Sequence, residues 1–417
     1  MKIKLGMQPM KLGQAAAYCG GELYDFTGSA GVEFSYICTD SREADKDTMF
    51  VAIRGERVDG HDYIGQAIAA GCRCILCEYV PQDICAQSVG AAVVEDSVAA
   101  FCQLAKSYRI EKFGQNDPMK TVAITGSVGK TTTKEMVAAV LRRELNLYAA
   151  AGNFNSEIGM PLTVLDMPET TQVCVLEMGM SDLGEISRMT HIAEPDIAVI
   201  TNIGNSHIEN LGSRENICKA KLEITEGVPA DGWVILNADE PMLFAQKGKL
   251  TQNLLFVSLQ NPQADYRALN IRECEDSTEF DLVAGKRVVT NIRIPTIGRH
   301  NVYDATYAFA VGILLGMSDE EIKSGLMSFR NTGMRQNIYD YGGITIIEDC
   351  YNAGPESMKA AVEVLAKMAD KTGCRTVAVL GDMRELGEYS KQLHMGSKHG
   401  IEHRSQNQNR TRDRVGS

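Results

Sequence analysis

Residues 125–133 read TGSVGKTTT, and this stretch decides the fold expected of the chain. It follows the apolar run TVAI at 121–124, which predicts a buried strand, and precedes KEMVAAVL at 134–141, which predicts a helix. A glycine-rich loop between a strand and a helix wraps backbone N–H groups around a polyphosphate, and the helix N-terminus adds partial positive charge. The sequence therefore predicts an α/β protein that binds ATP or GTP.

Individual residues of this loop have distinct predicted roles. Gly126 and Gly129 let the backbone approach the phosphate oxygens, Lys130 reaches the terminal phosphates, and the Thr131 hydroxyl can ligate magnesium. The standard spacing places a glycine where Ile124 stands, so the loop is a shortened variant, T-G-x-x-G-K-T. A Gly-Lys-Thr string also occurs as a chance turn, but the flanking strand and helix favour the nucleotide interpretation.

The composition limits the classes of protein. A chain of 417 residues exceeds one ordinary core, so we expect two or three domains. A net charge of −12 argues against nucleic acid or an anionic membrane as a partner, because both select basic patches. Residues 1–16 have no continuous apolar core, and no stretch is apolar and long enough to span a bilayer, so we expect a cytoplasmic protein without an integral membrane segment.

The 12 cysteines are scattered rather than arranged in a framework. Cys72, Cys74 and Cys77 are close enough to suggest a metal site, but no second Cys/His pair lies nearby in the sequence to complete a tetrahedron. The stretch AGCRCILC at 70–77 is typical of a helix end that continues into a strand. We therefore favour reduced thiols packed in a core.

Strand and helix patterns alternate from residue 121 to about residue 320. Apolar runs at 173–176, 197–200 and 233–236 predict parallel strands covered on both faces. The predicted domains are an N-terminal domain at 1–113, a central domain at 118–330 and a third domain at 331–398, with a linker at 114–118.

The third domain follows a shorter pattern. Strands are predicted at 345–347 and 377–380, with a helix from Ser357 to about Ala369, which makes one β-α-β crossover. Residues 399–417 read HGIEHRSQNQNRTRDRVGS, which predicts a disordered or aberrant tail. One crossover cannot bury both faces of a sheet, so we expect a truncated or frameshifted third domain; a natural short tail is the alternative.

Two residues at predicted strand ends are candidate metal ligands. Glu177 closes the run 173–176, where a second magnesium-anchoring carboxylate belongs one β-α unit after a phosphate loop; the alternative is a solvated glutamate. His207 lies on a loop after the run 197–200, at the same predicted sheet edge. We weigh a magnesium or substrate role for it against an ordinary structural histidine.

Other polar residues give weaker signals. Lys219 and Lys221 fall in a predicted helix, and their spacing alone indicates ordinary surface lysines. Asn301 precedes an apolar stretch, where it caps a helix or bonds adenine or ribose.

Taken together, these segments resemble the ATP-dependent muramyl (Mur) ligase family of peptidoglycan synthesis over residues 35 to about 390. The ordered set of motifs is far more specific than any single motif. It comprises TDSR at 39–42, TGSVGKTTT at 125–133, NFNSEIGMPLT at 153–163, Glu177, TNIGNSHIENLGS at 201–213, AKLEI at 220–224, NAD at 237–239, GRHN at 298–301 and Met334-Arg335.

Two later motifs narrow the resemblance within the family. EDCYNAGPESM at 348–358 and GDMRELG at 381–387 are similar to members that join D-alanyl-D-alanine to UDP-N-acetylmuramoyl-tripeptide. Members that add the third amino acid differ at both places and carry an Asp-Asn-Pro-Arg motif that this sequence lacks. The resemblance implies an α/β, three-domain Mur ligase architecture, with a central P-loop parallel-sheet domain and an incomplete Rossmann-like C-terminal domain.

The resemblance also implies roles for single residues. Those implied to bind ATP are Gly126, Ser127, Val128, Gly129, Lys130, Thr131, Thr132, Asn301, Arg335 and Asp349. Those implied to hold Mg²⁺ are Thr131, Glu177 and His207, and the catalytic set is Lys130, Glu177, His207 and Lys221, the last matching a lysine that is carbamylated in several members. Those implied to contact substrate are Ser41, Arg42, Asn153, Asn155, Thr163, Tyr351 and Asn352.

The implied reaction is ATP-dependent amide synthesis through an acyl phosphate, carried out by a monomer. Asp304 stands where the family often has Asn, which weakens an expected adenine-side contact, and an early end of the third domain removes much of the dipeptide cleft. The alternatives are another Mur ligase, an enzyme like folylpolyglutamate synthase, or a non-catalytic nucleotide-binding protein. The third residue of the tripeptide, meso-diaminopimelate or lysine, leaves no signal in the sequence.

Overall fold

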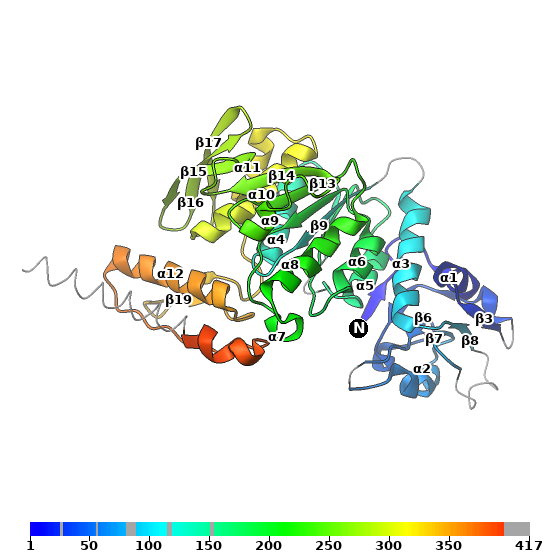
Figure 1. Ribbon diagram of the computed structural model, residues 1–417. Coiled ribbons are helices and arrows are strands. Elements are labelled where there is room, and N and C mark those ends of the chain that lie inside the picture. Colours follow the sequence, from blue (N-terminus) through cyan, green and yellow to red (C-terminus); the bar gives the residue numbers. More distant parts are fainter. Residues whose placement is uncertain (26–27, 56, 81–88, 115–118, 151–153, 396–417) are drawn as a thin grey trace, which may run out of the picture. The chain divides into compact units, whose positions relative to one another are not determined.

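The computed structural model describes residues 1–25, 28–55, 57–80, 89–114, 119–150 and 154–395 (Figure 1). Asn153 and the tail at 399–417 lie outside these residues. The chain divides into two compact units. The first unit comprises Met1–Thr121, Asn146–Met178 and Arg188–Glu194, and the second comprises Val122–Leu145, Gly179–Ser187 and Pro195–Ser417. The predicted domain boundaries stay predictions.

The first unit contains a mixed sheet with the strand order β1-β5-β6-β7-β8-β3. Strands β5 to β8 run parallel, while β1 and β3 pair antiparallel at the two edges. The elements of this unit are β1 (Lys2–Lys4), β2 (Met10–Lys11), α1 (Leu12–Cys19), β3 (Glu22–Asp25), β4 (Glu33–Phe34), β5 (Tyr36–Cys38), β6 (Thr48–Val51), α2 (Ile64–Ala69), β7 (Cys74–Cys77), β8 (Gly90–Val93), α3 (Ser97–Phe113), β10 (Leu147–Ala149), α5 (Gly159–Asp166) and β11 (Val173–Glu177).

The core of this unit explains its cysteine content. Strand β7 is buried along its whole length, and Cys72, Cys74 and Cys77 are all buried free thiols. Cys72 donates its thiol hydrogen to the Thr48 carbonyl oxygen over 3.0 Å. The predicted helix end running into a strand is confirmed, since α2 ends at Ala69 and β7 begins at Cys74.

The second unit contains the phosphate-loop motif and a sheet in which strands lie in the order β9-β12-β13-β14-β15-β16-β17. The pairs from β9 to β15 are parallel, which confirms the predicted parallel sheet. Its elements are β9 (Lys120–Thr125), α4 (Lys130–Leu141), β12 (Ile197–Ile200), α7 (Ile208–Leu211), α8 (Arg214–Leu222), β13 (Trp233–Asn237), α9 (Pro241–Phe244), β14 (Asn253–Ser258), β15 (Tyr266–Glu273), β16 (Thr278–Ala284), β17 (Arg287–Ile294), α10 (Arg299–Leu314) and α11 (Asp319–Ser328). Helix α6 (Glu185–Ala193) has residues in both units.

Strands β15, β16 and β17 extend this sheet as an antiparallel meander. Residues along β16 alternate strictly between buried and half-buried, the pattern of a strand with one covered face. Gly285, at φ +60°, lies in the turn that joins β16 to β17. Among the helices of this unit, α4 packs against α10 and α11 (Figure 1). These helices hold the first turn of α4 in place.

The last part of the second unit contains β18 (Asn337–Tyr341), β19 (Ile344–Glu348) and α12 (Pro355–Thr372). The strand predicted at 345–347 and the helix predicted at 357–369 are confirmed. The strand predicted at 377–380 is wrong, because those residues have no regular structure and Val379 is 93% exposed. A strand needs a neighbour to pair its backbone groups, and β19 pairs antiparallel with β18 rather than with this stretch. Among the described residues, no helix combines the length and apolarity that crossing a bilayer requires.

Candidate functional site

The phosphate loop follows β9 directly, and α4 begins at Lys130. Gly126 has φ +151° and Gly129 has φ +86°, conformations that favour glycine. A Cβ at position 126 would lie 1.8 Å from the Thr201 hydroxyl oxygen. The backbone conformation at these two positions therefore confirms that the loop requires glycine there.

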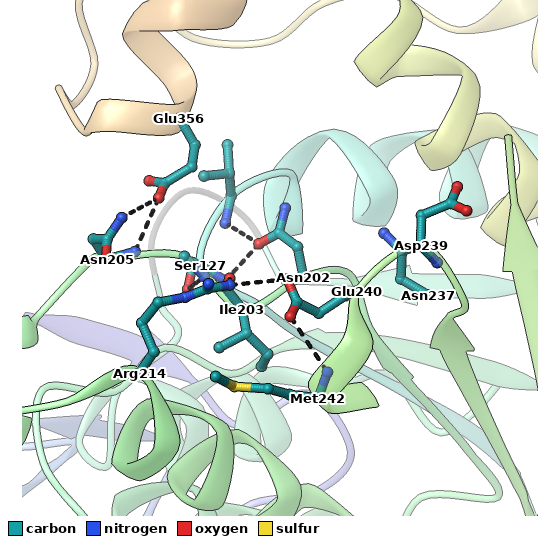
Figure 2. A network of polar contacts seen from close by, with 12 residues as sticks. Ser127, Asn202, Ile203, Asn205, Arg214, Asn237, Asp239, Glu240, Met242 and Glu356 are labelled. Carbon is teal, nitrogen blue, oxygen red and sulfur yellow. Dashed lines mark hydrogen bonds and ion pairs between the residues drawn. The ribbon is translucent and has the colours of Figure 1, made fainter. Parts of the chain in front are cut away.

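A second loop, residues 201–205, supports the phosphate loop (Figure 2). Asn202 Oδ1 accepts hydrogen bonds from the backbone N–H groups of Ser127 (3.1 Å) and Val128 (2.9 Å). The Gly204 N–H donates to Ser127 Oγ over 2.8 Å, and the Thr201 hydroxyl donates to the Val128 carbonyl over 2.6 Å. Because Asn202 already occupies two N–H groups, a phosphate must bind other donors of the loop or displace Asn202.

Two lysines, Lys130 and Lys221, are predicted to act at the site. Lys130 Nζ donates to the Gly126 carbonyl oxygen over 2.9 Å, so its side chain folds back across the loop. Lys221, on α8, is only 2% exposed, and the expectation of an ordinary surface lysine is wrong for it. Burial, with a further contribution from the positive charge of Lys130, lowers the pKa of Lys221 well below its usual value. Lys219, two residues earlier, is exposed as expected.

His207 precedes α7 and has the left-handed backbone φ of +62°. Its Nδ1 lies 2.6 Å from Oε2 of Glu385, a residue on the segment after α12. Burial lowers the pKa of His207; Lys130 and Lys221 lower it further, while Glu385 opposes them. The direct contact of His207 is with Glu385, and its placement in one site with Lys130 and Lys221 stays a prediction.

Helix α10 contacts the site through two side chains, Asp304 and Tyr307. Asp304 is buried and accepts a hydrogen bond from the Thr133 hydroxyl over 2.7 Å, and a Cβ on Gly129 would lie 2.8 Å from its Oδ1. The Tyr307 hydroxyl donates to the Thr201 carbonyl over 2.7 Å. Asp304 thus packs against the phosphate loop, and the weakened adenine-side contact that the resemblance implied stays a prediction.

Comparison with known proteins shows the family of the chain. The chain matches the Mur ligase family catalytic domain at residues 33–109, the Mur ligase middle domain at 124–312 and the Mur ligase glutamate ligase domain at 334–404. It is 41% identical to the UDP-N-acetylmuramoyl-tripeptide–D-alanyl-D-alanine ligase of Bacillus subtilis, over 86% of this chain and 75% of that protein. The chain belongs to the Mur ligase family.

Solved structures of the Mur ligase family share the fold. The chain superimposes on MurF from Acinetobacter baumannii with a TM-score of 0.84 and 30% identity, covering 94% of this chain and 83% of that one. It superimposes on MurF from Thermotoga maritima in complex with ADP with a TM-score of 0.78 and 30% identity, covering 88% and 81%. The expected α/β Mur ligase fold is therefore confirmed.

In this Mur ligase family member, Asn301 does not act as the cap of α10, because Gly298 is the N-cap residue. Asn301 is buried, and its Nδ2 lies within hydrogen-bond distance of Thr296 Oγ1 (3.2 Å), the Ile297 carbonyl (2.8 Å) and Gln336 Oε1 (2.9 Å). The amide donors are thus already engaged, so its predicted adenine contact requires its carbonyl oxygen or a rearrangement.

Three predicted residues gather around Gln336, the residue before β18. Arg335 places its guanidinium carbon 4.1 Å from the centre of the Tyr351 ring, and Asp349 Oδ1 accepts a hydrogen bond from the Gln336 N–H over 3.3 Å. Burial raises the pKa of Asp349. Asn352 lies nearby in the sequence and accepts from the Ala353 N–H over 2.9 Å. The predicted ATP and dipeptide residues of this segment thus include a stacked Arg–Tyr pair.

Thr131 and Thr132 lie in the first turn of α4, and the remaining predicted residues belong to the first unit. Glu177 ends β11 and accepts a hydrogen bond from Asn155 Nδ2 over 3.0 Å, which brings two predicted residues together. Thr163 is buried in α5, with its hydroxyl donating to the Gly159 carbonyl. Ser41 donates to Gln66 Oε1 over 2.9 Å, and Arg42 pairs with Asp40, which holds the pKa of that carboxyl well below its usual range. The roles of these residues stay predictions.

Sequence reasoning missed several residues that shape the site. Asn202 and Gly204 were part of a quoted motif but had no assigned role, while Gln336, Glu356 and Glu385 received no role at all. The side chains of the last three contact residues that lie 35 or more positions away in the chain, so no local pattern marks them. For Asn202, its position directly after a strand at the phosphate-loop edge was an available signal.

Proposed function

We propose that this chain is an ATP-dependent amide ligase that joins D-alanyl-D-alanine to UDP-N-acetylmuramoyl-tripeptide in peptidoglycan precursor synthesis. The observation that carries the proposal is the glycine-constrained phosphate loop with the side chain of Lys130 folded across it, in a chain closely related to ligases of that name. The motifs at 348–358 and 381–387 support the dipeptide as the incoming amine.

The chemistry follows from the groups at the site. The γ-phosphoryl group of ATP passes to the terminal carboxylate of the tripeptide, which gives an acyl phosphate and ADP. The amine nitrogen of D-alanyl-D-alanine then attacks the acyl carbon, loses a proton, and expels phosphate with the electron pair of the C–O bond. Lys130 stabilises negative charge on the phosphates, and Thr131, in the first turn of α4, lies beside them.

Mg²⁺ is the proposed metal. The Thr131 hydroxyl and the Glu177 carboxylate are oxygen donors of the kind that this hard cation prefers. His207 is a nitrogen donor whose lowered pKa favours the neutral ring, although Glu385 lies against its Nδ1. We propose Thr131, Glu177 and His207 as the ligands of Mg²⁺, the set that the resemblance to the family implies. When bound, the metal neutralises charge on the phosphates.

Two alternatives remain distinct in their chemistry. Another Mur ligase or a folylpolyglutamate-synthase-like enzyme would accept a single amino acid, and a non-catalytic relative would bind ATP without dipeptide-dependent turnover. The measurement that separates them is ADP release with UDP-N-acetylmuramoyl-tripeptide, with and without D-alanyl-D-alanine, and with single amino acids in its place. We expect release that depends on the dipeptide. ATP-induced thermal stabilisation without such release would overturn the ligase and leave a nucleotide-binding protein.

We place the protein in the cytoplasm and as a monomer. ATP as a substrate supports the first proposal, since the reaction requires a compartment that supplies ATP. The same ligation assay on size-fractionated protein tests the second, because activity should elute at the mass of one chain.

A further inference from the structure

The side chain of Glu356 links the segment after α11 to the loop that supports the phosphate loop. Glu356 lies in the first turn of α12, and its Oε1 accepts two hydrogen bonds from Asn205, one from the backbone N–H (3.1 Å) and one from Nδ2 (2.6 Å). Figure 2 shows this carboxylate above the loop. Hydrogen bonds to a carboxylate are among the stronger polar contacts in proteins.

The chain around Asn205 carries this contact directly to the phosphate loop. Gly204, the preceding residue, donates its N–H to Ser127 Oγ, and Asn202 holds the N–H groups of Ser127 and Val128. A Cβ at position 204 would lie 2.9 Å from the carboxyl carbon of Glu356. The absence of a side chain at Gly204 therefore allows the carboxylate to lie on the backbone of the loop.

Further contacts join the segment after α12 to residues 207–212. Glu385 lies 2.6 Å from His207 and accepts from the Glu209 N–H over 3.2 Å, and the Tyr389 hydroxyl lies 3.3 Å from the Gly212 carbonyl oxygen. The other oxygen of Glu356, Oε2, is buried without a hydrogen-bond partner among the described residues. Burying a carboxylate oxygen without a hydrogen bond costs free energy, so the two hydrogen bonds to Oε1 are needed to hold Glu356 in this position.

We infer that Glu356 is a positioning residue that couples closure of the segment 331–395 to the state of the phosphate loop. This inference rests on the proposed function. Amide synthesis requires the amine to reach the acyl phosphate before water does, and α12 directly follows residues 349–352, which are predicted to lie near nucleotide and dipeptide. Glu356 holds that segment on the loop through Asn205, so that the phosphate loop and the amine site are assembled together.

The test compares three variants with the unaltered chain. E356A removes both hydrogen bonds, E356Q keeps a carbonyl oxygen that can accept them, and K359A changes an exposed residue three positions along the same helix. ADP and amide are measured in the same reaction. We expect E356A to raise the ratio of ADP released to amide formed roughly ten-fold, the order for losing a hydrogen bond to a charged group, as water consumes the acyl phosphate. E356Q should largely restore the ratio, and K359A should not change it.

A double variant tests the pairing itself. N205A removes only the hydrogen bond from Nδ2 and should raise the ratio less than E356A does. N205A with E356A should raise it no further than E356A alone, because E356A already removes both hydrogen bonds. Additive effects, or an E356A ratio equal to that of the unaltered chain, would overturn the inference.

A readout without turnover separates this inference from the proposed function. Backbone hydrogen exchange in α12 and in residues 201–212 should become faster in E356A, not in K359A, whether or not the chain makes an amide. Unchanged exchange in E356A would overturn the inference even in an active ligase. Faster exchange in a chain without dipeptide-dependent ADP release would keep the contact and overturn only the ligase assignment.

Discussion

Thr133, in the first turn of α4, donates its hydroxyl hydrogen to Oδ1 of Asp304, on α10, over 2.7 Å. Both side chains are buried, and 171 residues separate them in the sequence. Burial raises the pKa of Asp304 to about 7, against the lowering effect of the Thr133 hydrogen bond. The helix of the phosphate loop therefore rests on a carboxyl group that stays protonated well above the usual range of aspartate.

This relationship predicts a pH dependence of stability. The folded state binds the Asp304 proton more tightly than the unfolded state, so the contribution of Asp304 to the free energy of unfolding is highest below pH ~4 and falls as pH rises toward 7. The interval between 3.8 and about 7 sets an upper limit of about 4 kcal/mol on this loss. D304N keeps an acceptor for Thr133 and removes the titration, so its melting temperature should fall less over this window. A parallel fall in both proteins would contradict the prediction.

Lys130 is predicted to act on the phosphates and not on the fold. K130A should lower kcat for dipeptide-dependent ADP release by roughly 10³-fold, the order for removing one charge-stabilising group from such a site. Its melting temperature without ATP should stay within a few degrees of that of the unaltered chain. K219A is the matched control, because Lys219 is an exposed cation on α8. Unchanged turnover in K130A would refute the phosphate assignment.

Replacing Lys221 by methionine should lower the ligase activity without lowering the stability at pH 7. Because its folded pKa lies below its unfolded value, the contribution of Lys221 to the free energy of unfolding rises with pH up to about 10.5, as the unfolded state loses its extra proton. K221M removes this cost, so it should be at least as stable as the unaltered chain at pH 7 and show a flatter rise with pH. Its ligase activity should fall by at least about 100-fold. Chemical denaturation from pH 7 to 10 and the ADP assay measure the two effects, and an active K221M would argue against a catalytic role.

Gly126 should tolerate no side chain. In G126A the new Cβ would collide with the Thr201 hydroxyl oxygen, so the loop must move and nucleotide affinity should fall at least ~10-fold, about 1.4 kcal/mol. G248A is the control, since Gly248 also has a positive φ but no atom within 4 Å of the added Cβ. G248A should cost about 1–2 kcal/mol of stability and leave nucleotide affinity unchanged. Titration calorimetry with ADP compares the two.

Cysteine labelling should report nucleotide binding. Cys350 and Cys374 are the exposed cysteines of the described chain, whereas burial raises the pKa of Cys74, Cys77 and Cys102 to about 12. A maleimide should therefore label Cys350 and Cys374 first, as measured by peptide mass. ATP should slow labelling of Cys350, which lies between Asp349, a residue predicted to bind ATP, and Tyr351, a residue predicted to contact substrate, and not of Cys374. Equal rates with and without ATP would place the nucleotide elsewhere.

Much of the central fold could be predicted because it depends on local patterns. Continuous apolar runs marked β9, β11, β12 and β13, and the glycine spacing marked the loop before α4. The antiparallel meander β15–β17 was not predicted, although β16 alternates buried and half-buried residues, because the parallel pattern was taken to continue.

The candidate site was predictable only where a residue's role is set by its neighbours in sequence. Lys130 is fixed by the loop that contains it. Lys221 looked like a surface residue because its burial arises from packing that α8 alone does not show. Val377 and Val379 looked like strand residues from apolarity, but pairing partners decide strands, and those residues have none among the described strands.

The contacts of Gln336 bear on how residues 337–348 can move. Its side chain joins Asn301 and the Ile297 carbonyl, and α12 adds the Lys367–Glu273 ion pair at 2.7 Å. In the described chain β18 and β19 pair only with each other, so no ladder of backbone hydrogen bonds ties residues 337–348 to the sheet of β9. Residues 337–348 can therefore separate from that sheet by exchanging a few contacts with water, without breaking the hydrogen bonds between paired strands. This opening should be a fast, reversible fluctuation of the folded enzyme rather than a step of partial unfolding.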